Sequence, residues 1–100
     1  MPWVSSIRDM ATTIGKASAV QKFHSAQVVS FRASSQNPTV LPNAAVIVGG
    51  AGSTNNTISI DCSAATCTAG TASVLLYGSD VYGGKDRVQF TVTINGTLDA

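Results

Sequence analysis

The two cysteines are the residues whose spacing most directly predicts chemistry. Cys62 and Cys67 enclose the four residues Ser-Ala-Ala-Thr. If these form a hairpin loop, the cysteines lie opposite each other on antiparallel strands, where Cα atoms are about 4.5–5.5 Å apart and a disulfide can close. Two reduced, buried thiols are an alternative. A zinc site is a third interpretation, although it needs four ligands and His24 is the only imidazole in the chain.

Candidates for catalysis or metal binding are few. A nucleophilic triad brings Ser or Cys, His and an acid together, and the sequence has no Gly-x-Ser-x-Gly elbow to place a serine beside His24. The acids Asp61, Asp80 and Asp86 do not have the spacing of a calcium loop. The sequence therefore predicts a non-enzymatic protein without catalytic residues or a metal site.

A glycine-rich stretch follows the apolar run Val46-Ile47-Val48. Gly49, Gly50 and Gly52 suggest the phosphate-binding turn of a dinucleotide site, but Asn55 stands where that motif has its third glycine. The residues after it, 57–60, alternate like a strand, whereas the motif needs a helix N-terminus. We therefore expect a connection between two strands and no cofactor.

The elements that position these residues are mostly strands. Residues 88–95 alternate strictly, so Val88, Phe90, Val92 and Ile94 share one face and the polar residues share the other. Residues 57–62 alternate in the same way. We expect further strands at 26–33, with Val29 and Phe31 inward, and at 44–48, covered on both faces.

Residues 67–77 are expected to return beside the 57–62 strand. If Cys67 faces inward, Leu75 and Tyr77 do so too. A β-bulge at Gly70 would instead turn Val74 and Leu76 inward, and the sequence leaves both alternatives open.

The first quarter of the chain has a different pattern. Apolar residues recur every three or four positions, which predicts an amphipathic helix over residues 3–23, although Thr12, Thr13 and Gly15 weaken a helix interior. Such a stripe packs on the sheet or docks as an arm on a neighbouring subunit. On the second interpretation, the candidate assembly-interface residues are Trp3, Ile7, Met10 and Ile14.

Length and composition set the fold class. One hundred residues predict one compact domain, with an N-terminal amphipathic helix or arm at 1–25 and a β domain at 26–100. Charged residues are 11% of the chain and Ser plus Thr number 23, which favours β structure with a neutral surface. We predict a mainly β chain: a single antiparallel sheet, small sandwich or barrel of about five or six strands.

The charge pattern bears on partners. The net charge is +1, and the basic residues Arg8, Lys16, Lys22 and Arg32 lie in the first third against one acid, Asp9. This excess is small, so nucleic-acid binding through these four residues is a minor alternative to a solvated surface. No stretch approaches the roughly 20 apolar residues of a membrane-spanning helix, and the N-terminus lacks the order of a signal peptide.

Together these features predict a structural protein that self-assembles. A disulfide without an export signal, a neutral surface and no catalytic constellation fit a small virion component, such as a phage capsid, coat or decoration protein. It would be made in the cytoplasm and bind copies of itself and other structural proteins. Residues 88–94 contain no Lys or Pro to discourage edge pairing. The alternative is a secreted or cell-surface β module, similar to an adhesin or fimbrial subunit, without its leader.

Overall fold

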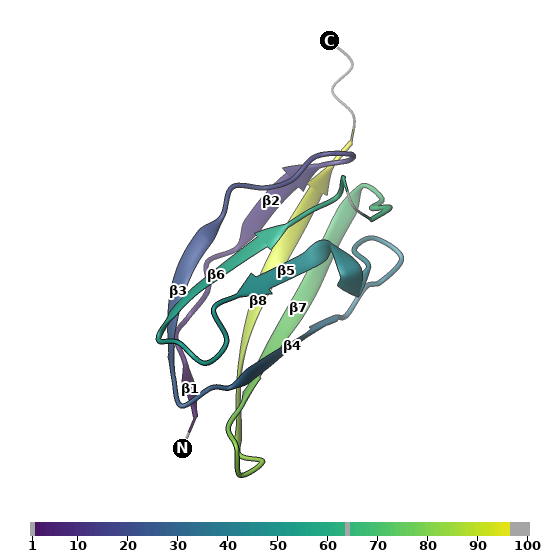
Figure 1. Cartoon of the computed structure of the whole chain (residues 1–100). Helices are drawn as coiled ribbons and strands as arrows, with labels where there is room; N and C mark the ends of the chain where they lie inside the picture. The colour runs from purple at the N-terminus through teal and green to yellow at the C-terminus, as the bar shows by residue number, and fades with distance from the viewer. Residues whose placement is uncertain (1, 64, 97–100) are drawn as a thin grey trace.

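Eight strands form two facing four-stranded sheets in the computed structural model, which describes residues 2–63 and 65–96 (Figure 1). The first sheet has the order β1-β3-β6-β5 and the second the order β2-β8-β7-β4. The strands and one short 3-10 helix are β1 (Trp3–Val4), β2 (Met10–Thr13), β3 (Gln21–Ala26), β4 (Ser30–Ser35), η1 (Asn43–Ala45), β5 (Val46–Gly49), β6 (Asn55–Ile60), β7 (Gly70–Ser79) and β8 (Lys85–Asn95).

The prediction of a mainly β chain is confirmed; of the three architectures it allowed, the structure is a small sandwich rather than a single antiparallel sheet or a barrel, and it has eight strands rather than five or six. The two sheets bury their apolar residues against each other. The pairing is also not entirely antiparallel, because β2 pairs with β8 in parallel. The described residues contain no helix long and apolar enough to cross a membrane.

Strand β8 is the centre of the second sheet. It pairs antiparallel with β7 over ten residues and parallel with β2 over four. Phe90, Val92 and Ile94 are buried and Val88 packs partly against them, so the predicted inward face is confirmed. The strand does not end its sheet, however, because β2 pairs with Val92–Asn95 on the side away from β7.

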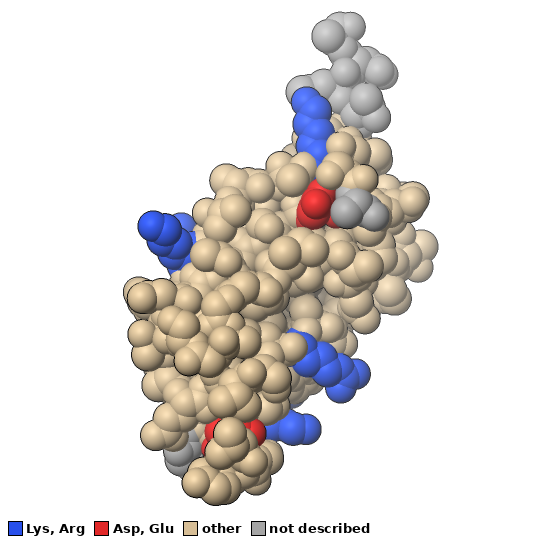
Figure 2. Space-filling view, in the orientation of Figure 1, with Lys and Arg blue, Asp and Glu red and all other residues tan. Residues whose placement is uncertain are grey.

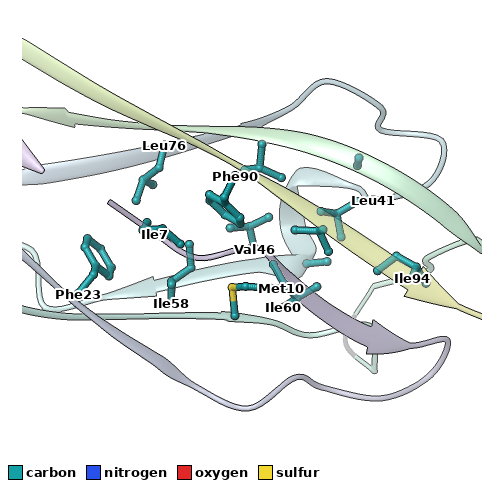
Figure 3. Close-up of a cluster of buried hydrophobic side chains, with 14 of the residues drawn as sticks. Ile7, Met10, Phe23, Leu41, Val46, Ile58, Ile60, Leu76, Phe90 and Ile94 are labelled. Atoms are coloured by element: carbon teal, nitrogen blue, oxygen red, sulfur yellow. The ribbon is translucent and has the colours of Figure 1, made fainter. Parts of the chain in front are cut away.

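The core fills the space between the sheets (Figure 3). Ile58 and Ile60 of β6 face Leu76 of β7 and Phe90 of β8, and all four side chains are buried. Phe23 of the first sheet meets Phe31 of the second edge-on, with ring centroids 5.6 Å apart. Burying such side chains stabilises the fold by roughly 1.5–3 kcal/mol each.

The predicted N-terminal helix is wrong. Residues 3–23 form β1, β2 and the start of β3, and the chain crosses from the first sheet to the second between β1 and β2. Ile7 lies at this crossing and Met10 begins β2, and both point into the core. The crossing therefore produces the spacing of three and four that we interpreted as helical. Gly15 then ends β2 with a φ of 80°, a conformation that favours glycine.

Two carboxylates hold this N-terminal segment to β8. The Val4 N–H donates to Asp86 Oδ2 at 2.9 Å, and the Thr91 N–H donates to Asp9 Oδ1 at 2.9 Å. Each bond joins residues 82 positions apart in the sequence. The first quarter of the chain is thus a structural part of both sheets.

The predicted strand at 26–33 is divided between the sheets. Ala26 ends β3, Gln27 has a φ of 60° and Ser30 begins β4. Val28 is therefore buried and Val29 is exposed, the reverse of the prediction for Val29. Only Phe31 keeps its predicted inward orientation.

Strands β5 and β7 also differ from the prediction. Strand β5 is covered on one face, because Val46 is buried and Ile47 is exposed. Strand β7 pairs with β4 and β8 rather than with β6, and its register with β8 runs without a bulge from Gly70 to Ser79. Val74 and Leu76 face the core, since Cys67 lies before the strand and does not set its alternation.

Candidate functional site

The predicted disulfide is present, with Cys62 and Cys67 Sγ atoms bonded and Cα atoms 5.5 Å apart. Its setting differs from the prediction. The cysteines flank the connection from β6 to β7, and these strands belong to different sheets. The bond therefore closes a loop between the two layers rather than a hairpin within one.

The remaining chemical candidates stay apart. His24 is exposed on β3, and its Nδ1 lies 3.3 Å from the Thr54 carbonyl oxygen rather than beside a carboxylate. Within the described residues no three His, Cys, Asp or Glu side chains gather as a metal site. Residues 50–54 connect β5 to β6, and a strand follows them, as expected for a β–β loop.

The four candidate assembly residues do not share a surface. Ile7 and Met10 are in the core, Ile14 is half-buried against it, and only Trp3 is largely exposed, at 52%. The apolar area of Ile7 and Met10 is therefore already covered within the chain.

The four basic residues are also dispersed. Lys22 points outward from β3 in the first sheet and Arg32 points outward from β4 in the second, so they lie on opposite faces of the sandwich. Arg8 and Lys16 are exposed in the connections before and after β2. In Figure 2 the blue side chains stand apart and do not merge into a patch.

The free edge of β4 is the feature that stands out in the described fold. Strand β4 is the last strand of its sheet and pairs only with β7. The Gln36 N–H donates to the Ser73 carbonyl at 2.8 Å, which fixes the hydrogen-bonding phase of the ladder. Bonded and non-bonded pairs alternate along an antiparallel ladder. Ser34 and Arg32 therefore bond to β7, while the N–H and C=O groups of Phe31 and Ala33 point away from it.

Both ends of this edge are closed. Asn43 Oδ1 accepts the Ser35 N–H at 2.7 Å, so a side chain covers the next outward amide. At the other end, the Val29 N–H donates to the Ser79 carbonyl, although Ser79 pairs with Ser30. Val29 and Ser30 thus form a bulge opposite Ser79, and bulges limit edge pairing.

Edge strand β5 of the first sheet directs fewer backbone N–H and C=O groups outward than β4 does. The Asp61 N–H donates to the Ala45 carbonyl at 2.7 Å, so the same alternation turns Ile47 toward β6 and Val48 outward. Strand β5 therefore presents fewer outward backbone groups than β4. Sequence reasoning did not identify β4 or β5 as an edge strand, because no residue pattern reveals which strand ends a sheet.

The tip of the β7–β8 hairpin is a second exposed feature. Val81 is 70% and Tyr82 is 93% exposed, the largest values among the exposed large apolar side chains of the described chain. With Val29, they border a hollow of about 230 Å³ at this end of the sandwich. The sequence showed these residues within a turn-rich connection but not their position beside Val29.

Comparisons with known proteins identify the fold alone. No family model and no curated protein sequence matches the chain. The titin M3 domain is similar in structure, with a TM-score of 0.62 and 8% identity over 94% of this chain and 96% of that domain. A titin M10–obscurin-like 1 Ig complex contains a chain with a TM-score of 0.58 and 12% identity, covering 96% of this chain and 95% of that one. The sandwich is therefore immunoglobulin-like.

The disulfide differs from that of antibody domains. There, a buried disulfide joins strands B and F of the two sheets beside a tryptophan. Here Cys62 and Cys67 lie in a connection, and Phe23 and Phe31 form the aromatic contact between the sheets. The centre of this core is held by apolar packing.

Proposed function

We propose that this chain is a non-enzymatic structural protein that self-associates by pairing the free edge of β4 with the same edge of a second copy. The observation that carries the proposal is the outward orientation of the Phe31 and Ala33 backbone groups. Unpaired N–H and C=O groups in a row are a template for another strand. Because the same edge is used twice, the contact has two-fold symmetry and closes as a dimer.

The register of this pairing follows from counting hydrogen bonds. If Arg32 lies on the two-fold axis, Phe31 faces Ala33 of the second copy on both sides, and four backbone hydrogen bonds form. Centring the axis on Phe31 aligns only the two Phe31 residues and gives two bonds. At roughly 0.5–1.5 kcal/mol net for each bond, the first register is favoured by about 1–3 kcal/mol.

Arg32 limits the strength of this contact. In the favoured register the two Arg32 side chains lie opposite each other on the outer face of the sheet. Like charges in this position destabilise the pairing, by an amount comparable to the roughly 0.2–1 kcal/mol of a favourable cross-strand pair. The dimer is therefore expected to be weak at low salt and stronger at high salt, which screens the repulsion.

The fold comparison and the composition support an assembly role. One of the similar solved structures is a complex of titin M10 with obscurin-like 1 Ig, so other domains with this fold bind one another. The chain has few charges, and its disulfide suits a protein that persists outside the cytosol. On these grounds we propose a small virion component. A secreted or cell-surface module is the alternative, and mass spectrometry of purified particles would separate the two.

The experiment is cross-linking of an Arg32→Cys variant under mild oxidation. In the favoured register residue 32 is a non-hydrogen-bonded pair with its symmetry mate, and its Cα atoms are about 4.5 Å apart, within disulfide range. We expect a covalent dimer joined through residue 32. Thr91→Cys, on the same outer face but on central strand β8, is the matched control. Dimer yields that are equal for the two variants would overturn the proposal.

A further inference from the structure

Two arginines and a tyrosine form a row across the outer face of the second sheet. Tyr77 of β7 pairs with Arg32 of β4 on one side and with Arg87 of β8 on the other. Because the backbone N–H and C=O of Tyr77 bond to Arg32, those two Cα atoms are about 5.5 Å apart, while Tyr77 and Arg87 form the closer, non-bonded type of pair at about 4.5 Å. The two arginines are therefore about 10 Å apart at their Cα atoms, with a phenol ring between them.

A third cation lies beside this row. Lys85 precedes Arg87 by two residues on β8, so both side chains leave the strand on the same face. Arg32, Lys85 and Arg87 are all exposed. Their side chains make no hydrogen bond or ion pair with any other residue that the structure describes. All three charges are thus available to a ligand.

The acids near these cations are directed elsewhere. Asp86 is the only acid within the four strands of this sheet, and it lies on the inner face, where its carboxylate accepts the Val4 N–H. Asp80, in the β7–β8 turn, accepts two backbone N–H groups of that same turn. Asp9 lies beside Thr91, farther along β8, and accepts its N–H. The strands of the second sheet therefore present cations and no acid on their outer face, which selects an anionic ligand.

From this arrangement we infer that the row Arg32–Tyr77–Arg87, together with Lys85, binds single-stranded nucleic acid. The row lies on an open sheet face rather than in a pocket, so it suits an extended polymer. Guanidinium groups bind phosphate through charge-assisted hydrogen bonds, and here one stands on each side of an aromatic ring. Bases of a single strand are free to stack on such a ring, whereas the bases of a duplex are stacked on one another.

The inference goes beyond the proposed self-association and does not depend on it. If the edges of β4 pair in the favoured register, the two Arg32 side chains become neighbours and the two rows join into one. A strand bound across the joined rows would neutralise the Arg32 pair, so nucleic-acid binding and edge pairing would strengthen each other. Salt separates the two contacts, because it screens the repulsion in the dimer but weakens the binding of phosphates.

The test is fluorescence anisotropy of a labelled oligothymidylate of about 12 nucleotides, titrated with dilute protein at several salt concentrations. Three phosphate contacts predict that the logarithm of the association constant falls with the logarithm of salt concentration with a slope of about −2. Arg32→Gln and Arg87→Gln should each reduce that slope by about 0.7. Lys22→Gln removes the same charge from the outer face of the first sheet, so this matched control should leave the slope unchanged.

Variants of Tyr77 separate stacking from charge. Tyr77→Ser should weaken binding roughly tenfold with the slope unchanged, and Tyr77→Phe, which keeps the ring, should bind like the wild type. The inference is overturned if the oligonucleotide does not bind at low salt, if Lys22→Gln reduces the slope as much as the arginine variants do, or if Tyr77→Ser binds normally. Equally tight binding of duplex DNA or heparin would overturn it too. Cross-linking of Arg32→Cys without oligonucleotide binding to the wild type would leave the edge proposal intact, and the reverse result would leave only this inference.

Discussion

At the residue scale, the loops at the two ends of β6 are fixed by different chemistry. Before the strand, buried Asn56 accepts a hydrogen bond from the Ser25 hydroxyl at 2.6 Å, and its Nδ2 donates to the Gly50 carbonyl at 2.8 Å. Gly50 itself has no room for a Cβ, which would lie 2.3 Å from the Asn55 carbonyl oxygen. After the strand, the covalent Cys62–Cys67 disulfide fixes the second loop.

Removing the disulfide should reduce stability by a moderate amount. The bond closes a short loop, with a sequence separation of 5, and chain entropy assigns about 2 kcal/mol to a loop of that size. We expect Cys62→Ala with Cys67→Ala to lower the free energy of unfolding by about 2 kcal/mol in urea titration. The wild-type protein with reductant is the control and should lose a similar amount. An unchanged midpoint would show that the bond contributes nothing to folding.

At the element scale, strand β7 shows what alternation decides and what it leaves open. Leu75 and Leu76 are neighbours in sequence, yet Leu76 is fully buried while Leu75 lies half-buried on the outer face. The sequence allowed either assignment. The structure decides it through the unbroken register with β8, which places Leu76 opposite Val88 and Leu75 opposite Gln89.

Truncating these two leucines tests the assignment directly. Leu76→Ala leaves a cavity between the sheets and should cost about 2–5 kcal/mol of unfolding free energy. Leu75→Ala removes the same atoms from a surface that solvent already reaches, so we expect a clearly smaller loss. Thermal and urea unfolding of both variants provides the measurement. Equal losses for the two would contradict the burial of Leu76 alone.

Strands with apolar residues on alternate positions could be predicted, and strands with polar inward residues could not. Ile58 and Ile60 marked β6 correctly, and Phe90 and Val92 marked β8. Strand β3 was missed because its inward residues include Gln21 and Ser25. The Gln21 side chain is buried, accepting the Arg8 N–H and donating to the Arg8 carbonyl. A polar residue of this type is expected to face solvent. It faces the core here because its hydrogen-bonding partner lies elsewhere in the sequence.

At the scale of the whole molecule, the order of strands decides the function we propose. Strand β8 looked suited to edge pairing, but β7 pairs along one side of it and β2 pairs with Val92–Asn95 on the other. Strand β4 has a less regular sequence but lies at the end of its sheet, with the Phe31 and Ala33 backbone groups directed outward. Which strand ends a sheet depends on contacts between distant segments, such as the parallel pairing of β2 with β8. The spacing of Cys62 and Cys67 favoured a disulfide but placed it in a hairpin rather than between the sheets. The free edge and the exposed tip could not be predicted.

Amide hydrogen exchange at increasing protein concentration tests the central claim most directly. The N–H groups of Phe31 and Ala33 should exchange rapidly in dilute solution and become protected as the concentration rises, because edge pairing covers them. The Val48 N–H, on the free edge of β5, is the internal control and should remain unprotected throughout. Exchange at Phe31 and Ala33 that does not change between micromolar and millimolar protein would contradict self-association through β4.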